Sequence, residues 1–505
     1  MNRRGLVLII VMVAVVFLSL GAYSFTDLMV AHRESADLAG RQAQTRLLVD
    51  SGVEAIRLFL QLDPDSQKEA GGVYDNPAMF RGRTVIPAEE LEERGSFTLV
   101  SPALDDDSQL AGIRYGLENE STRLNLNALT KLDELQPGTG RQLLMSLPSM
   151  TEDVADAILD WLDADSEPRE LGAEVDYYSG LSRPYTPRNG ALDTVEELLL
   201  VRGVTPQLLF GQDANRNGQI DPAESAAAAN RGSTMDNGLV RGWSAHLTLY
   251  STERNTDPQG RPRINLNMNN MEELHRRLSE VFPPDWATFI VAYRQNGPAT
   301  AAGQAKAGES RTPDLTKPAK TQLTQVLDLI GAKTQCRFPG DNQAAVIDSP
   351  FGSELVAMAI YLDKLLDHTT INPALTIPGR ININQAPATI LRGIPGMTEE
   401  ILTQLLARRK VVDEDEIGNR RHETWLVTLG VCTLDEMRLL APFITSGGNV
   451  HRGQVVGYFQ GGTAASRAEV VFETTGPLPR VLFWRDLSHL GRGYTVETLG
   501  VDFSE

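Results

Sequence analysis

The sequence predicts an α+β protein: a long N-terminal helix, a β-sheet packed on it, and a large all-helical region inserted into that sheet. Residues 6–62 have helical periodicity with no internal proline. Strand-like alternation occurs near both ends of the remaining chain, at 96–118 and at 454–484. Between these segments one short motif recurs three times within helical sequence, which indicates internal repeats.

The chain begins with a segment that can cross a membrane. Arg3 and Arg4 precede 22 uncharged residues from Gly5 to Thr26, and a helix of that length spans about 33 Å, enough for a bilayer core of about 30 Å. The positive residues favour a cytoplasmic N-terminus. A secretory signal peptide is the alternative, but the apolar run is long for one and no small-residue cleavage site ends it.

The N-terminal helix continues beyond the apolar stretch. Apolar residues recur at helical spacing with charged residues between them, and Pro64 is the first proline. We therefore expect one helix over 6–62, apolar all round in its first half and amphipathic in its second. The second half would pack on a sheet, and the first half on a membrane or on similar helices.

Strands are expected on both sides of the helical region. Residues 96–100 and 110–118 alternate in polarity and flank an acidic turn, which predicts a hairpin. Residues 454–459, 467–473 and 480–484 alternate in the same way. The two strand-rich ends should join in one sheet on the long helix.

The recurring motif is R-[IL]-N-[IL]-N, at 123–127, 263–267 and 380–384. A proline turn and an apolar helix follow each copy, and a second short helix ending at glycine comes next (Gly203, Gly331 and Gly430). Three partial copies of one helical unit are the simplest explanation. Residues 296–322 are rich in Ala, Gly, Pro, Thr and Lys and read as a flexible loop.

One loop has the ligand spacing of a calcium site. Residues 213–224 fit the pattern D-x-[DN]-x-[DN]-G-x5-E throughout. Calcium prefers six to eight oxygen ligands, and Gly218 allows the sharp turn that such a loop needs. The expected ligands are Asp213, Asn215, Asn217, the carbonyl of Gln219, Asp221 and Glu224. An ordinary polar surface turn is the alternative.

Composition narrows the functional classes. The 505 residues carry a net charge of −19, which disfavours a phosphate-rich partner such as nucleic acid. The sequence contains no glycine-rich phosphate loop, nucleophile elbow or metalloprotease helix, so we expect no enzymatic activity. Two cysteines exclude a disulfide-dense scaffold. Cys336 and Cys432 form one disulfide or remain two buried thiols.

The N-terminus resembles that of type IV pilin-like proteins, which combine a short basic leader ending in glycine with an apolar and then amphipathic helix. The resemblance implies cleavage by a prepilin peptidase between Gly5 and Leu6. Most members of the family carry glutamate at the fifth mature position, which is Ile10 here. This chain resembles one family of minor pseudopilins of type II secretion, the general secretion pathway protein K family, whose members also lack that glutamate.

The first helical repeat strengthens this resemblance. It contains a D-W-x-D-x-D run at 160–165, a G-A-E-x-x-Y-Y segment at 172–178 and an N-G-x-L-x-x-x-E-E-L-L segment at 189–199, as protein K does. The helical domain of that family binds calcium. The resemblance therefore implies further candidate ligands, which are Asp160, Asp163, Asp165, Glu167 and Glu174. A solvated, capped turn is the alternative.

The proline-glycine turn at 394–396 resembles a helix-hairpin-helix module, which often binds DNA. Here Thr398 replaces the second glycine and Glu399 and Glu400 follow, where a phosphate would lie. This favours a role in protein packing. A membrane-tethered DNA receptor of a competence-like system is the alternative function that we retain, and a membrane-anchored hydrolase is a third.

Together these resemblances imply a pilin-like sheet with an inserted all-α region of helix-hairpin-helix (SAM-like) repeats. The implied function is that of a minor pseudopilin that caps or initiates the pseudopilus of a type II protein secretion system. Implied partners are the I-type and J-type minor pseudopilins, the major pseudopilin and prepilin peptidase, with calcium as cofactor. The implied location is the inner membrane, crossed once, with most of the chain in the periplasm.

The sequence also predicts domain boundaries. They are a leader at 1–5, the N-terminal helix at 6–62, the first part of the sheet at 63–122, the first helical repeat with its calcium loop at 123–241, the second N-x-N unit at 242–295, a flexible linker at 296–322, the rest of the second helical unit at 323–375, the third helix-hairpin-helix unit at 376–445, and C-terminal strands at 446–505.

Overall fold

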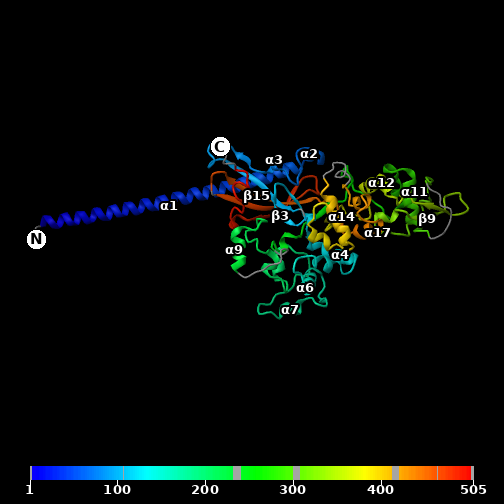
Figure 1. Ribbon diagram of the computed structural model, residues 1–505, viewed down its shortest axis with the longest axis horizontal. Helices are drawn as coiled ribbons and strands as arrows, with labels where there is room; N and C mark the ends of the chain where they lie inside the picture. The colour runs from blue at the N-terminus through cyan, green and yellow to red at the C-terminus, as the bar shows by residue number, and fades with distance from the viewer. Residues whose placement is uncertain are drawn as a thin grey trace.

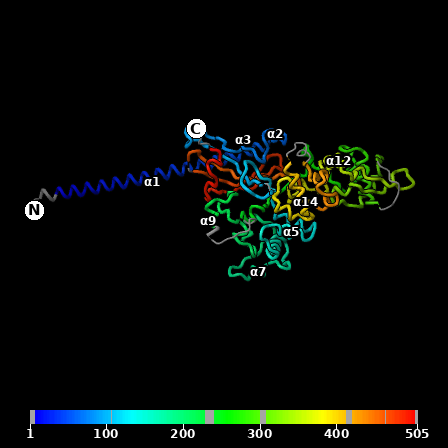
Figure 2. Tube along the Cα trace, viewed as in Figure 1, coloured from blue at the N-terminus to red at the C-terminus, as the bar shows by residue number. Residues whose placement is uncertain are grey.

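A computed structural model describes residues 3–105, 107–230, 240–299, 308–411, 420–462 and 464–501 of the chain. Helix α1 (Arg3–Leu60) projects far from the remainder of the molecule. Its C-terminal part lies on a sheet. The first part of the helical insert lies below this sheet in the view of Figure 1, and the later part extends on the side away from the N-terminus. The trace in Figure 2 shows that both strand-rich ends of the chain, cyan-blue and red, meet in this sheet.

The two halves of α1 have different surroundings. Every residue from Val7 to Gly40 is exposed, whereas Leu48, Val49 and Ile56 are buried. Among the described residues, α1 is the one helix that is long and apolar enough to cross a membrane, and its most apolar stretch is exposed. The predicted helix over 6–62 is confirmed, with its end at Leu60.

The sheet has seven strands, all antiparallel to their neighbours. Its order is β1 (Arg83–Ile86), β2 (Gly95–Leu104), β15 (Val450–Phe459), β16 (Ala465–Glu473) and β17 (Arg480–Asp486), with β3 (Leu110–Arg114) paired to β2 and β4 (Glu118–Asn119) paired to β15. The β2–β15 pair joins the two ends of the chain, with Val455 opposite Leu99. The predicted single sheet on the long helix is therefore confirmed.

Helix α1 packs closely on the centre of one sheet face. Val53 and Ile56 join Phe97 and Val455 in a buried apolar cluster. Gly52 makes this close approach possible, since a Cβ there would lie 2.7 Å from Val455 Cγ1. The small residue lets the helix backbone reach the strands, so this contact fixes where the amphipathic half of the helix sits.

The opposite sheet face is covered by the end of the chain. Because side chains alternate along a strand, Val456 faces away from α1. It packs with Tyr458, Tyr494 and Leu499 in a second apolar cluster. We call residues 487–501 the C-terminal segment; it lies on this face.

The insert is mainly helical and has one continuous apolar core. Its helices are α4 (Leu129–Leu135), α5 (Thr139–Leu144), α6 (Glu152–Leu162), α7 (Val175–Ser179), α8 (Pro206–Phe210), α9 (Pro222–Asn230), α10 (Met271–Val281), α11 (Pro284–Asn296), α12 (Leu355–His368), α13 (Ala388–Arg392), α14 (Glu399–Arg409), α16 (Trp425–Thr428) and α17 (Leu434–Leu440). Two short helices, α2 (Pro64–Glu69) and α3 (Pro77–Phe80), precede the sheet, and the antiparallel pairs β7 (Thr252–Arg254) with β12 (Thr376–Pro378) and β9 (Lys333–Cys336) with β10 (Ala345–Asp348) complete the insert.

Each copy of the repeated motif begins a unit that is closed by a short parallel strand pair. The pairs are β5 (Leu124–Asn125) with β6 (Leu247–Thr248), β8 (Ile264–Asn265) with β11 (Thr369–Thr370), and β13 (Ile381–Asn382) with β14 (Ile444–Thr445). The motif therefore brings the beginning and the end of each unit together.

The asparagines explain why the motif recurs. In every copy the first asparagine accepts a hydrogen bond from the backbone N–H of the second, at 2.9–3.0 Å. The second asparagine then binds a distant backbone segment. Asn127 makes two hydrogen bonds to Leu192, and Asn267 makes the same two to Leu323. In the third copy Asn384 binds the carbonyl of Ser446 and the Trp425 indole instead.

The predicted helix-glycine elements differ from expectation in two units. Residues Val195–Leu200 and Val326–Leu329 form 3₁₀ turns, and only the third element is a short α-helix, α16. Each 3₁₀ turn begins with a capping box and ends where Val201 or Ile330 adopts an extended backbone conformation, so the turn does not continue into a longer helix.

Part of the predicted flexible stretch is held in place. Within 296–322, residues 300–307 lie outside the described residues. Gln295 in α11 donates a 2.8 Å hydrogen bond to the carbonyl of Asp314, and Arg294 donates to that of Thr321. These contacts tie the end of the stretch to the core helix α11.

Candidate metal centres

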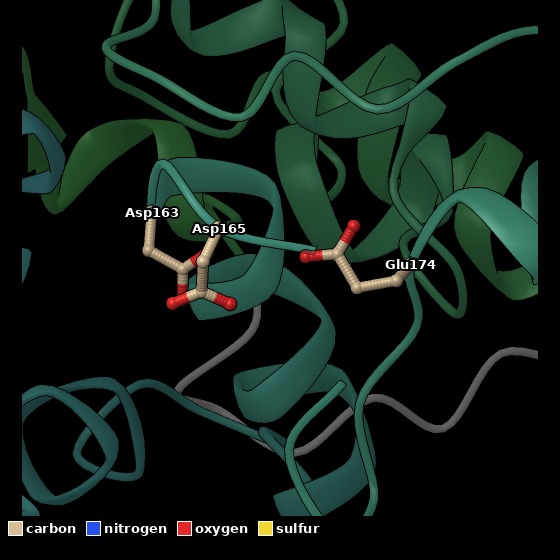
Figure 3. A group of neighbouring side chains, drawn as sticks. All are labelled: Asp163, Asp165 and Glu174. Carbon is tan, nitrogen blue, oxygen red and sulfur yellow. The ribbon is translucent and has the colours of Figure 1, made fainter. Parts of the chain in front are cut away.

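Three carboxylates meet at the end of helix α6. The chain turns after Leu162 and presents Asp163 and Asp165, and Glu174 reaches toward them from the start of α7 (Figure 3). One oxygen of each carboxylate lies within 4.8 Å of the other two. We call Asp163, Asp165 and Glu174 the acidic cluster.

Several oxygen atoms at the acidic cluster have no donor. Glu174 is 4% exposed, and neither of its carboxylate oxygens accepts a hydrogen bond of good geometry from the described residues, although the Asn189 side chain and the Val175 N–H lie close enough to lower its pKa. Asp163 Oδ1 and Asn189 Oδ1 are also buried without a donor in that part of the chain. Burial raises the pKa of Glu174, and the charges of Asp160 and Asp163 raise it further. A bound cation would remove this cost, because it supplies the charge that the buried oxygens lack.

Arg169 binds the other side of the same turn. Its guanidinium contacts Asp160 at 2.8 Å and also binds Asp163. Asp160 is fully buried, and Gly172 leaves room for it, since a Cβ there would lie 1.8 Å from Asp160 Oδ2. The Arg169 guanidinium therefore balances the charge of Asp160.

Of the five carboxylates expected here, the structure brings three together. Asp160 is paired with Arg169, and Glu167 is exposed and lies outside the cluster. The sequence prediction missed Asn189, which lies beside Glu174 and donates to the carbonyl of Asp165. The Asn189-Gly190 pair was the available sequence signal, because such pairs often adopt left-handed turns, and Asn189 has a φ of 47° in the structure.

The loop 213–224 has its candidate ligands turned inward. The oxygens of Asp213 accept from the backbone N–H groups of Asn217 (3.0 Å) and Gly218 (2.8 Å). Those of Glu224 accept from the N–H groups of Asn215 (3.1 Å) and Asp221 (3.0 Å). The first and twelfth positions of the pattern are thus tied to the loop between them.

The remaining contacts complete this arrangement. Asn215 Nδ2 lies 2.6 Å from Asp221 Oδ2, and Gly218 has a φ of 74°. Burial raises the pKa of Asp213 despite the backbone hydrogen bonds that it accepts, and the charge of Glu224 contributes. Carboxylate and amide oxygens are the ligands that calcium prefers, so the residues of this loop fit calcium. The Gln219 carbonyl is the seventh-position candidate.

The other predicted site residues lie elsewhere. Cys336 in β9 and Cys432 before α17 are both buried and free, which is the thiol alternative; the disulfide is not formed. Burial raises the pKa of the Cys432 thiol to about 12. Gly5 and Leu6 fall within α1, and their side chains lie outside the described part of the chain.

The architecture, a long apolar N-terminal helix on an antiparallel sheet with a helical insert, agrees with the resemblance to pilin-like proteins. Comparison with known proteins is more specific. Residues 122–210 match the family model described as type II secretion system protein K. This region contains the acidic cluster.

Two curated relatives carry the same name. The type II secretion system protein K of Pseudomonas aeruginosa is 32% identical over 123 residues, 23% of this chain and 36% of the relative. That of Pectobacterium carotovorum is 33% identical over 99 residues, 19% of this chain and 28% of the relative. The chain spans about a third of the length of the relatives it matches. The resemblance to protein K predicted from the sequence is confirmed.

A solved structure is also similar. It is the crystal structure of the GspK-GspI-GspJ complex from the type 2 secretion system of enterotoxigenic Escherichia coli. The match has a TM-score of 0.37 at 11% sequence identity, and it covers 91% of this chain and 98% of the matched chain.

Proposed function

We propose that this chain is a minor pseudopilin that caps or initiates the pseudopilus of a type II protein secretion system. The match of residues 122–210 to the protein K family carries this proposal. The long exposed N-terminal helix supports it, because an apolar helix can remain in a bilayer or join a bundle of similar helices. The role is structural, in assembly for export across the outer membrane, and involves no chemical reaction.

The position of the insert supports a place at the tip. The later part of the insert, with α11, α12 and α17, extends from the sheet on the side away from the projecting half of α1 (Figure 1). A subunit stacked beyond the sheet would meet this bulk. Ile10 is exposed and stands where most pilin-like proteins have glutamate, so this chain lacks one charged group that could contact the next subunit.

The proposed partners are the I-type and J-type minor pseudopilins and the major pseudopilin. Prepilin peptidase would cut between Gly5 and Leu6. The proposed location is the inner membrane, with Arg3 and Arg4 at the cytoplasmic end and the sheet and insert in the periplasm.

Calcium is the proposed cofactor, at the acidic cluster and at the loop 213–224. The buried, donor-free oxygens of Glu174 support the first site. The inward-facing Asp213 and Glu224 support the second. When bound, calcium would supply the positive charge that lets these carboxylates stay close.

We also propose that helices α13 and α14 form a helix-hairpin-helix (SAM-like) module used for packing within the protein. In the connecting turn Ile394 and Pro395 are buried, and a Cβ at Gly396 would lie 3.2 Å from Leu439 Cβ, so one side of this turn packs on the protein although Gly396 itself is exposed. Accordingly the chain should not bind duplex DNA at physiological salt. A gel shift at sub-micromolar protein that weakens steeply with salt would instead favour the DNA-receptor alternative.

Disruption of the gene in its host tests the proposed function. Type II substrates should then accumulate in the periplasm, and secretion should return when the intact gene is supplied. A variant lacking residues 123–445 is the informative comparison, since the insert is what distinguishes a capping subunit. Normal secretion after disruption would contradict the proposal.

A further inference from the structure

We propose that the loop 213–224 is a joint that couples calcium binding to the docking of the helical insert on the sheet. This inference rests on the calcium site proposed above for the loop. It adds that the insert and the sheet body hold one another more firmly when calcium is bound.

The outer side of the loop is held by the sheet body. The carbonyl oxygens of residues 215–217 each accept a hydrogen bond from a side chain on that side. The donors are Arg467 in β16, Gln454 in β15 at 2.7 Å and Tyr494 in the C-terminal segment at 2.9 Å. Three successive carbonyls of a candidate metal loop therefore contact parts of the chain more than two hundred residues away.

Asn217 belongs to both sides of the joint. Its Oδ1, a candidate ligand, accepts from the N–H of Gln219 at 2.7 Å. Its Nδ2 donates to the carbonyl of Gly493 at 2.6 Å, and the residue is 2% exposed. An aspartate would place a carboxylate against that carbonyl, so the amide at this position serves the loop and the docking together.

The contacts are made away from water, which increases their effect. Arg467 is 1% exposed and Tyr494 is 7% exposed. The Tyr494 hydroxyl also lies 2.9 Å from Gln454 Oε1, so the donors form one small network. Hydrogen bonds in such surroundings are stronger, and an orphaned carbonyl there is more costly.

These observations give a physical route for coupling. Calcium would draw the side chains at positions 213, 215 and 217 toward one point and so fix the backbone between them. The carbonyls of residues 215–217 are then held where Arg467, Gln454 and Tyr494 can reach them. Coupling is reciprocal, so contacts on the sheet side must also raise calcium affinity.

Reciprocity makes Tyr494→Phe the informative variant, because it keeps the ring and removes only the hydroxyl. Tyr115→Phe is the matched control: the Tyr115 hydroxyl donates to the carbonyl of Thr498 at 2.7 Å in the same segment, not to the loop. Both changes are made in the full-length protein in detergent, with Glu174→Gln present to disable the acidic cluster.

Two measurements are needed, a calorimetric calcium titration and amide hydrogen exchange with calcium and with chelator. Loss of one hydrogen bond should weaken calcium binding by about five-fold in Tyr494→Phe, with no change in Tyr115→Phe. Calcium should slow exchange in the C-terminal segment. The proposed coupling would be wrong if Tyr494→Phe binds calcium with unchanged affinity, or if amide exchange in the C-terminal segment has the same rate with calcium and with chelator. Neither result would argue against calcium binding by the loop.

The calcium loop itself is tested separately by Glu224→Ala. If calcium binding in this background is the same with and without Glu224, the ion is not bound by the loop. The proposed site and the joint would then both be rejected.

Discussion

Replacing Glu174 with glutamine should stabilise the protein when calcium is removed and weaken its response when calcium is added. Without a cation, Glu174 is a buried carboxyl with no hydrogen bond of good geometry to either oxygen among the described residues. An unsatisfied buried polar group costs about 1–3 kcal/mol. The glutamine amide can donate to Asp163 Oδ1 or Asn189 Oδ1, which also lack donors. The variant should therefore gain about 1–3 kcal/mol in chelator.

Calcium should reduce or reverse the difference in stability between wild type and Glu174→Gln. A ligand at one hundred times its Kd adds about 2.7 kcal/mol to the stability of the protein that binds it. Wild type should receive this increment at the acidic cluster, and Glu174→Gln should lose most of it because a charged ligand is gone.

The pH dependence in chelator should differ as well. The pKa of Glu174 is raised in the folded state, so the folded protein holds this proton more tightly than the unfolded chain does. Stability from this group is therefore greatest at low pH and falls as pH rises from the ordinary glutamate pKa through the raised one. Glu174→Gln should lack that fall.

Urea unfolding of the full-length protein in detergent, with calcium and with chelator, measures these effects. Glu167→Gln is the matched control, because Glu167 is an exposed acid of the same turn outside the cluster. It should leave both curves unchanged. If Glu174→Gln is destabilised in chelator, or responds to calcium as wild type does, the carboxylates do not form a cation site.

Three further predictions concern the fold and the N-terminus. Gly52→Ala should destabilise the protein by about 1–3 kcal/mol, because its Cβ would meet Val455 Cγ1 at 2.7 Å. Gly40→Ala is the control and should not destabilise it, because Gly40 is an exposed position of the same helix where a Cβ meets no atom within 4 Å. Equal unfolding curves for the two variants would contradict the packing of α1. Ser149→Gly should stabilise by about 0.5–1 kcal/mol, because Ser149 has a φ of 55° where the third repeat has Gly396; a lower urea midpoint would show that the serine side chain matters more than its backbone. N-terminal sequencing of the membrane-extracted protein should begin at Leu6, and a start at Met1 or after Ala22 would reject prepilin-type processing.

Much of the architecture could be predicted because it depends on local patterns. The helical periodicity of residues 6–62 and the alternation of the end strands follow from which side chains must be buried. The N-x-N repeats were visible for the same reason: Asn125 and its counterparts cap the turn that follows them. The parallel strand pairs that close each unit could not be predicted, since β5 and β6 are two residues long and lie more than one hundred residues apart.

The candidate sites show a similar division. Spacing alone marked the loop 213–224, because one short segment supplies every candidate ligand. At the acidic cluster the sequence could not separate Asp160 from Asp163. Arg169 binds both, and only the fold shows that Asp163 also lies near Asp165 and Glu174 whereas Asp160 is buried against Gly172. Nor could it show that Asn189, distant in sequence, would reach Glu174. The docking of residues 215–217 on the sheet is set by tertiary contacts with no sequence signature.

The central claim, that this chain is a minor pseudopilin, is tested most directly by its assembly with other pseudopilins. The full-length protein should be expressed with the I-type, J-type and major pseudopilins of the same host, extracted in detergent, and examined by native mass spectrometry. We predict a complex that contains this chain together with the I-type and J-type subunits. If the chain appears alone, or only with copies of itself, under conditions in which the other pseudopilins associate, the assigned function is wrong.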